Sequence, residues 1–283
     1  MKNLEMETGR DSVDCLVGAF PAYYEDASVT IFHGDCMEIM ATMPSDSVDI
    51  TVTSPPYNLG EGMEDKGGLR VAHNGSKWGG SKLRNGYATH GDALPYDDYV
   101  AAQRDVLREC WRISMGAIYY NHKPRIVKGE LRTPLTLCEG LPIRQIIVWD
   151  RGSGFNFMPA AYMPMSEWIV LLAKPKFKLR DRSASGAGDV WRMTPDRGNE
   201  HPASFPIQLP KTAIETSGAS VILDPFAGSG TTGLAAKNLG KKAVLIEREE
   251  RYCEIAAKRM AQGVLDFGTA NKGATFGAGG DVR

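Results

Sequence analysis

Residues 51–57, TVTSPPY, end an apolar run with a rigid corner that carries a hydroxyl and an aromatic ring. Two consecutive prolines, Pro55 and Pro56, fix two φ angles and remove two backbone donors, so the direction of the chain is set. Ser54 precedes them and Tyr57 follows them. A corner of this kind can hold hydrogen-bond acceptors beside a stacking surface.

A second stretch, VILDPFAGSGTTG at residues 221–233, has the pattern of a ligand-binding turn. A short apolar run leads to Asp224, a glycine turn follows, and then a helical pattern begins. Glycines let the backbone approach a ligand closely, and the first turn of a helix presents free N–H groups. Glu247 ends the next apolar run about twenty residues further on, where an acid can bind ribose hydroxyls. The pattern predicts an adenosine-type cofactor.

Short apolar runs recur along the chain and predict the strands that position these two stretches. Most runs are too continuous for half-exposed strands, which indicates a sheet covered on both faces. Helical patterns over residues 96–113, 231–239 and 249–262 alternate with them, so we expect an α/β fold with a mostly parallel sheet. The runs lie at residues 29–32, 48–53, 116–120, 145–149, 168–173, 221–223 and 243–246.

The glycine turn comes late in the chain, and only one clear strand pattern, at residues 243–246, follows it. The sheet must therefore be completed by strands that come earlier in the sequence. This circularly permuted order disfavours an ordinary dehydrogenase, in which further βα units follow the glycine turn.

Composition sets broad limits on the protein's class. The chain has 283 residues, a net charge of -1 and five scattered cysteines without a CxxC pair. Attraction to nucleic acid must therefore come from local patches, and neither a metal site nor a disulfide framework is expected. Acidic residues among the first twenty exclude a signal peptide, and no apolar run reaches the roughly 18 residues of a membrane span. We expect a cytoplasmic protein.

Together, the two motifs resemble those of the S-adenosylmethionine-dependent DNA amino-methyltransferases, in the permuted β subgroup. That family has a [DNS]-PP-[YFW] catalytic corner before a DPFxGxGTT cofactor loop. This chain has SPPY at 54–57 and DPFAGSGTT at 224–232, in that order, and the resemblance covers roughly residues 28–262. It implies a Rossmann-like methyltransferase fold with a mostly parallel seven-stranded sheet and helices on both faces.

The resemblance also places the strands relative to one another. The strand at 221–224 would be central, with the strands at 243–247 and 29–32 on one side. The strand at 48–53 would lie on the other side, so that the corner meets the cofactor loop at the switch point of the sheet.

Roles for single residues follow from the resemblance. HGDCMEIM at 33–40 looks like the adenine-contacting segment, and HPASFPIQLPKTAIETS at 201–217 looks like the element that covers the methionine end of the cofactor. The catalytic residues would be Ser54, Pro55, Pro56 and Tyr57. The cofactor-binding residues would be Asp35, Phe205, Asp224, Phe226, Gly228, Gly230, Thr231 and Glu247.

The chemistry of amino methylation explains the corner. An exocyclic amine of cytosine or adenine is a poor nucleophile because its lone pair is delocalised into the ring, whereas the cofactor's sulfonium methyl is already activated. Acceptors aimed at the two amino hydrogens would align the amine and oppose the delocalisation, and Ser54 Oγ and the Pro55 carbonyl are the candidates. The base must be flipped out of the duplex to reach them, and Tyr57 would stack on it.

The type of base follows a family bias that is not strict. Ser-Pro-Pro-Tyr members are mostly cytosine N4 methylases and Asp-Pro-Pro-Tyr members mostly adenine N6 methylases, so cytosine N4 is favoured and adenine N6 is the alternative. Methylation of a cytosine ring carbon needs a cysteine nucleophile, usually beside a proline, and none of the cysteines here precedes proline. Rival hypotheses are an NAD-dependent oxidoreductase, an inactive nucleic-acid-binding protein, and an RNA or protein amide methylase.

Two basic segments are candidates for DNA contact. Residues 58–95 hold no convincing element and predict a mobile DNA-contacting loop, because structureless loops of this length are usually functional or disordered. Residues 174–200 correspond to the family's target-recognition segment, which is short here. The predicted DNA-binding residues are Lys77, Trp78, Lys82, Arg84, Lys174, Lys176, Lys178 and Arg180.

The resulting organisation is an N-terminal arm at 1–27, a catalytic domain at 28–267 and a disordered tail at 268–283. Double-stranded DNA is the implied partner, and no membrane is involved. The resemblance leaves open a homodimer and a cognate restriction endonuclease.

Overall fold

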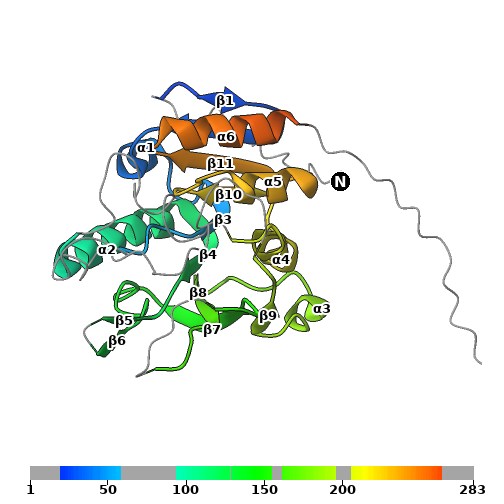
Figure 1. Ribbon diagram of the computed structural model, residues 1–283. Helices are drawn as coiled ribbons and strands as arrows, with labels where there is room; N and C mark the ends of the chain where they lie inside the picture. The colour runs from blue at the N-terminus through cyan, green and yellow to red at the C-terminus, as the bar shows by residue number, and fades with distance from the viewer. Residues whose placement is uncertain (1–19, 59–93, 128, 155–160, 196–204, 263–283) are drawn as a thin grey trace, which may run out of the picture.

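A nine-stranded sheet forms the centre of the protein, in the order β1-β2-β11-β10-β3-β4-β8-β7-β9 (Figure 1). The computed structural model describes residues 20–58, 94–127, 129–154, 161–195 and 205–262. The strands are β1 (Tyr24–Glu25), β2 (Val29–His33), β3 (Val48–Thr53), β4 (Ser114–His122), β7 (Ile143–Asp150), β8 (Ser166–Ala173), β9 (Val190–Arg192), β10 (Val221–Asp224) and β11 (Lys242–Glu247). A separate hairpin pairs β5 (Arg125–Val127) with β6 (Glu130–Arg132).

The sheet confirms the α/β class and the permuted order. Strand β10 pairs in parallel with β11 on one side and with β3 on the other, and all seven predicted strands are present. Two short strands extend the predicted sheet at its edges. One of them, β1, pairs with β2 and lies inside the predicted N-terminal arm, so residues 24–25 belong to the fold.

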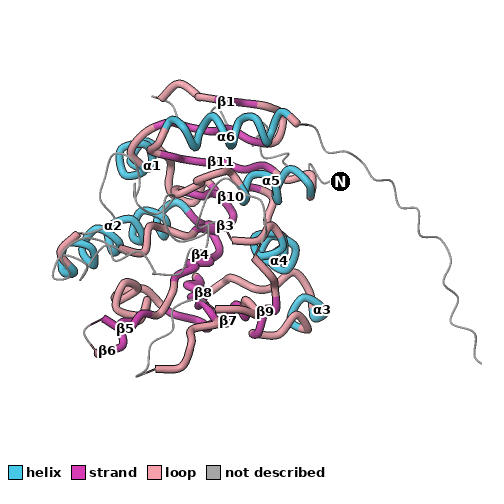
Figure 2. The backbone as a smooth tube through the Cα atoms, viewed as in Figure 1, coloured by secondary structure: helices cyan, strands magenta, loops and turns pink. Residues whose placement is uncertain are grey.

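Helices cover both faces of the sheet (Figure 2). They are α1 (Cys36–Thr42), α2 (Tyr96–Ile113), α3 (Arg182–Ser185), α4 (Gln208–Ser217), α5 (Thr231–Asn238) and α6 (Glu250–Ala261). Buried residues of α1 and α2 share one core cluster with β-strand side chains, and those of α4, α5 and α6 share the other. Among the described helices, none is long and apolar enough to cross a membrane.

Strand direction decides which side chains meet. Strands β2, β3, β4, β10 and β11 are parallel and end together, at what we call the carboxyl end of the sheet. Strand β8 runs the opposite way, with Trp168 opposite His122 and Ala173 opposite Ala117. The amino end of β8 therefore lies at the carboxyl end of the sheet, and Ala173 lies at the other end.

Candidate active site

The two sequence motifs meet where β3 and β10 end side by side. Thr53 Oγ1 donates a hydrogen bond to Asp224 Oδ1 (2.8 Å), and Thr232 Oγ1 donates to Asp224 Oδ2 (2.6 Å). The backbone N–H of Phe226 also donates to Oδ1. Burial raises the pKa of Asp224 to about 6. Both carboxylate oxygens are thus used to join the corner to the glycine turn, which makes Asp224 a positioning residue.

The glycine turn requires backbone angles that other residues adopt at a cost. Gly228 has a φ of 52°, and Gly230, at the N-terminus of α5, has a φ of 78°. A Cβ on Gly230 would lie 2.9 Å from the Cβ of Ala256 in α6. The glycines therefore allow both the turn itself and the close packing of α6 behind it.

Glu247 lies beside this turn as a buried carboxylate. Its Oε2 accepts a hydrogen bond from the N–H of Gly228 (2.7 Å), and its Oε1 accepts one from the N–H of Glu249 (2.9 Å). Burial raises the pKa of Glu247. A carboxylate has about four lone-pair sites, so the group can still accept a hydrogen bond from a bound hydroxyl.

The remaining predicted cofactor residues differ in how deeply they are buried. Asp35 caps α1 by accepting from the N–H of Met37, and its carboxylate stays partly exposed. Phe226 is partly buried, and Phe205 is buried in the same core cluster as Ala227 of the turn. Thr231 is buried at the start of α5, and its hydroxyl accepts a hydrogen bond from Arg259 of α6 (3.3 Å). A glycine turn at a helix N-terminus, next to a buried acid, fits the ribose and amino-acid parts of S-adenosylmethionine.

The corner itself contains a network of polar side chains from neighbouring strands. Tyr57 donates its hydroxyl proton to Glu167 Oε2 (2.9 Å), and Ser54 Oγ lies 2.8 Å from the same hydroxyl. Asn121 Nδ2 donates to the Tyr57 hydroxyl (2.7 Å) and to Glu167 Oε2 (3.0 Å). Arg151 Nη1 forms an ion pair with Glu167 Oε1 (3.1 Å). Ser54 and Tyr57 are half-buried, whereas Glu167 and Asn121 are buried.

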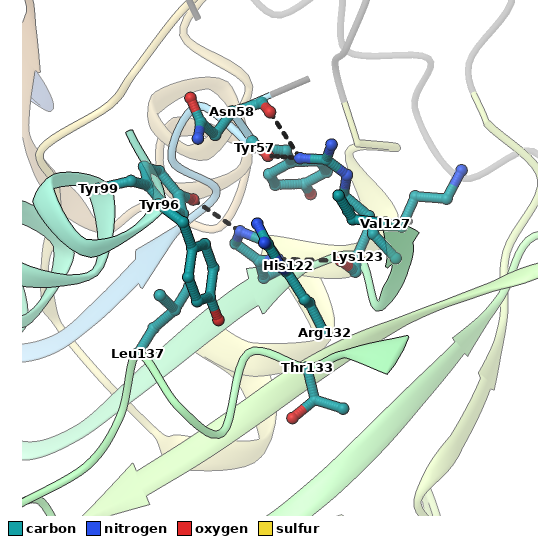
Figure 3. Close-up of a pocket in the computed structure, with 11 residues that line it drawn as sticks. Tyr57, Asn58, Tyr96, Tyr99, His122, Lys123, Val127, Arg132, Thr133 and Leu137 are labelled. Carbon is teal, nitrogen blue, oxygen red and sulfur yellow. Dashed lines mark hydrogen bonds between the residues drawn. The ribbon is translucent and has the colours of Figure 1, made fainter. Parts of the chain in front are cut away.

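Aromatic and basic side chains support the corner from behind (Figure 3). The Tyr57 ring packs against His122, with the ring centroids 4.5 Å apart. Tyr99 donates its hydroxyl proton to the Pro56 carbonyl (2.8 Å), and the Tyr99 hydroxyl oxygen lies 2.8 Å from His122 Nε2. Burial lowers the pKa of His122 to about 4. Arg125 donates to the carbonyls of Tyr57 and Asn58, so the backbone that follows the prolines is also held.

Sequence reasoning missed most of these supporting residues. Asn121 and His122 follow an apolar run that predicts only a strand, and Glu167 is a single acid at the start of another. The available signal was a polar residue at the end of a buried strand. The pairing of β4 with the antiparallel β8, which puts Asn121 beside Glu167, cannot be read from either run alone.

The predicted DNA-binding residues separate into two groups. Four of them, Lys77, Trp78, Lys82 and Arg84, lie outside the described residues. The other four follow β8 at the end of the sheet opposite the corner, since an eight-residue strand spans roughly 25 Å. There Lys174 pairs with Asp46, and Arg180 pairs with Asp181. For Lys174, Lys176, Lys178 and Arg180, this position argues against direct contact with DNA whose base enters the corner, and we revise that prediction.

Basic residues do lie at the carboxyl end of the sheet, where the corner is. Lys123 follows β4, Arg125 begins β5, and Arg151 follows β7. Arg192 ends β9 opposite Asp150, and its side chain is mostly exposed. Among the described residues, no group of three His, Cys, Asp or Glu side chains is arranged to hold a metal ion.

Comparison with known proteins finds DNA methyltransferases as relatives of this chain. A family model described as "DNA methylase", of the N6/N4 type, matches residues 48–258. The type II methyltransferase M.ScaI of Streptomyces caespitosus is 28% identical over 280 residues, which covers 84% of this chain and 83% of M.ScaI. The DNA adenine methyltransferase YhdJ of Escherichia coli K12 is 25% identical, with 86% of each chain covered.

Solved structures show the same fold. The PvuII DNA methyltransferase (cytosine-N4-specific) superimposes with a TM-score of 0.65 at 17% identity, covering 88% of this chain and 92% of that one. TTHA0409 of Thermus thermophilus, in complex with S-adenosyl-L-methionine, gives a TM-score of 0.56 at 24% identity, covering 84% and 95%. Because the family match extends over most of the chain and includes both motifs, the protein belongs to the N6/N4 family of DNA amino-methylases.

Proposed function

We propose that this DNA methylase transfers a methyl group to the N4 amine of a cytosine that is flipped out of double-stranded DNA. The junction of the two motifs supports methylation of an amine, and the serine at position 54 favours cytosine. The Thr53–Asp224 hydrogen bond joins the Ser54 corner to the turn beside Glu247. S-adenosylmethionine, the cofactor, supplies an activated sulfonium methyl when bound. Adenine N6 is the alternative target, because relatives named for either base match this chain.

The residues of this chain have separate tasks in that reaction. Glu247 and Asp35 would bind the ribose and adenine end of the cofactor, and Gly228 and Gly230 let it approach the backbone. Ser54 Oγ and the Pro55 carbonyl would accept hydrogen bonds from the target amine, which aligns it and keeps its lone pair available. Tyr57 would stack on the flipped base.

The test of the base is direct. Double-stranded DNA is incubated with the protein and S-adenosylmethionine carrying a labelled methyl group, digested to nucleosides, and analysed by mass. We expect N4-methyldeoxycytidine from the wild type and strongly reduced product from Ser54→Ala. N6-methyldeoxyadenosine as the labelled product would overturn the choice of cytosine, and an unlabelled digest would overturn the proposed activity.

We also propose that DNA phosphates contact basic residues at the carboxyl end of the sheet, where the base must enter. Arg192→Ala and Lys176→Ala form a matched pair, because both side chains are exposed and lie at opposite ends of the sheet. Removing one phosphate contact should reduce the slope of log affinity against log salt by about 1. We expect that change in Arg192→Ala and none in Lys176→Ala; equal slopes would contradict this assignment of the surface.

Pairing with a restriction endonuclease and formation of a homodimer remain predictions. Relatives such as M.ScaI are named as type II methyltransferases. Co-expression with the neighbouring genes and measurement of the mass in solution would test the two predictions separately.

A further inference from the structure

The corner contains a buried acid that amino methylation does not itself require. Glu167 is 6% exposed and lies at the amino end of β8, with one oxygen bound by Tyr57 and Asn121 and the other by Arg151. Burial of a charge is costly unless it is paired and hydrogen-bonded, and both conditions are met here. The carboxylate is therefore held in one orientation against the corner.

Counting protons along this network gives each hydrogen bond a direction. A carboxylate can only accept, so Tyr57 must use its single hydroxyl proton for Glu167 Oε2. The Tyr57 oxygen is then an acceptor toward Ser54, and Ser54 must donate its own proton across their 2.8 Å contact. Ser54 Oγ then has only its two lone pairs for other partners, one facing Asn121 Nδ2 at 3.3 Å and the other left for an incoming donor.

Asn121 reinforces the same direction. Its Nδ2 group donates to the Tyr57 oxygen and to Glu167 Oε2, and Ser54 Oγ lies 3.3 Å from the same group as a further acceptor. The opposite amide orientation would place Oδ1 against the carboxylate, where two acceptors repel. Tyr57 therefore receives protons from Asn121 and Ser54 and gives its own to Glu167.

We propose that Glu167 is a positioning residue that makes Ser54 Oγ an obligate acceptor for the amino hydrogen of the target base. This rests on the proposed function, because the acceptor has a use only if an amine enters the corner. Without the carboxylate, the serine proton could point toward the amine and oppose its hydrogen. Glu167 therefore acts on the target amine through the hydroxyls of Tyr57 and Ser54.

Glu167→Gln tests the direction of these hydrogen bonds, because it changes the donor and acceptor groups but hardly the shape of the side chain. Arg151 needs an acceptor where Oε1 lies, so the glutamine carbonyl takes that position and its NH₂ group faces Tyr57. That amide donates to the Tyr57 oxygen, and the Tyr57 proton must then turn toward Ser54. We expect the single-turnover rate of methyl transfer to fall about 10- to 100-fold, as for loss of a hydrogen bond to a charged group. Binding of S-adenosylhomocysteine and of DNA should stay within about twofold.

A double-mutant cycle separates positioning from mere structural support. Tyr57→Phe keeps the ring but removes the hydroxyl that links Glu167 to Ser54, so it should reduce the rate of methyl transfer by a similar factor. Glu167→Gln added to Tyr57→Phe should then cause no further loss, whereas a structural role through Arg151 or Asn121 would make the two losses multiply. Glu109→Gln, which alters another half-buried ion pair far from the corner, should keep the wild-type rate.

The outcomes distinguish this inference from the proposed function. If wild-type protein methylates DNA and Glu167→Gln is equally fast, the inference is wrong and the function stands. Multiplying losses in the double variant would also overturn it. If Glu167→Gln does not fold, Tyr57→Phe alone decides, because a wild-type rate of methyl transfer without the hydroxyl contradicts any role for these hydrogen bonds. Absence of transfer by the wild type would instead refute the proposed activity.

Discussion

The two halves of the active site are built from different kinds of contact. In the cofactor half (Asp224, Gly228, Gly230 and Glu247), Glu247 accepts from the backbone N–H groups of Gly228 and Glu249. Asp224 accepts from the N–H of Phe226 and from the hydroxyls of Thr53 and Thr232. In the corner half (Ser54, Tyr57, Asn121, Glu167 and Arg151), side chains bond to side chains from β3, β4, β7 and β8. Hydrogen bonds from backbone N–H groups depend mainly on local sequence. Hydrogen bonds between side chains depend on which strands are neighbours in the sheet.

Tyr57→Ala should show the largest effect and should leave the cofactor half intact. It removes a ring that can stack on the base, worth about 1–3 kcal/mol, together with a hydroxyl bonded to a carboxylate, worth about 1.5–3 kcal/mol. The single-turnover rate of methyl transfer should fall about 100- to 1000-fold. Calorimetry should give an unchanged affinity for S-adenosylhomocysteine, and a weakened affinity would mean that the two halves are not separate.

Glu247→Ala should produce the opposite pattern. It removes the acceptor for a ribose hydroxyl and leaves the N–H groups of Gly228 and Glu249 without their carboxylate. Since a hydrogen bond to a charged group is worth about 1.5–3 kcal/mol, we expect the dissociation constant of S-adenosylhomocysteine to rise about 10- to 100-fold. The control Glu254→Ala removes an exposed acid of α6 and should bind normally. Equal losses in both variants would show a general effect of charge.

The pH dependence of stability should have opposite signs in the two halves. Burial raises the pKa of Asp224 from 3.8 to about 6, so this group's contribution to stability is full below pH 3.8 and is lost as the pH rises through 6. Burial lowers the pKa of His122, behind the corner, from 6.5 to about 4. Its contribution is full above pH 6.5 and is lost as the pH falls through 4. Each effect amounts to roughly 3 kcal/mol.

Two variants separate these opposing contributions in urea unfolding between pH 4 and 7. Relative to wild type, the free energy of unfolding of Asp224→Asn should increase with pH, and that of His122→Gln should decrease with pH. Parallel curves for the three proteins would contradict the assignment of the two shifts.

Gly230→Ala tests the packing of α6 behind the glycine turn, and Gly240→Ala is its matched control. Both glycines have a positive φ, but a Cβ at Gly240 meets nothing within 4 Å, whereas one at Gly230 meets Ala256. The left-handed conformation costs about 1–2 kcal/mol in either case, and overpacking adds about 1–3 kcal/mol only at Gly230. Chemical denaturation should therefore show Gly230→Ala to be the less stable variant; equal losses would show that α6 moves aside.

Prediction from the sequence succeeded where a pattern is continuous along the chain. The seven main strands, the bounds of α2 and the meeting of the corner with the glycine turn were all expected. The edge strands β1 and β9 were missed, because strands of two or three residues leave no periodic signal. Lys174 and its neighbours were placed beside DNA from their charge and from the family's target-recognition segment, although the direction of β8 puts them at the other end of the sheet.

By itself, the sequence determined the two motifs, their permuted order and the family that carries them, because each motif is a run of adjacent residues whose backbone geometry is local. Only the tertiary structure decided what orients the corner. Glu167 and Asn121 meet because β8 runs antiparallel to β4, and that pairing is set by packing across the whole sheet. Hydrogen-bond direction in turn needs all the partners at once, so the acceptor role of Ser54 is a property of the assembled network.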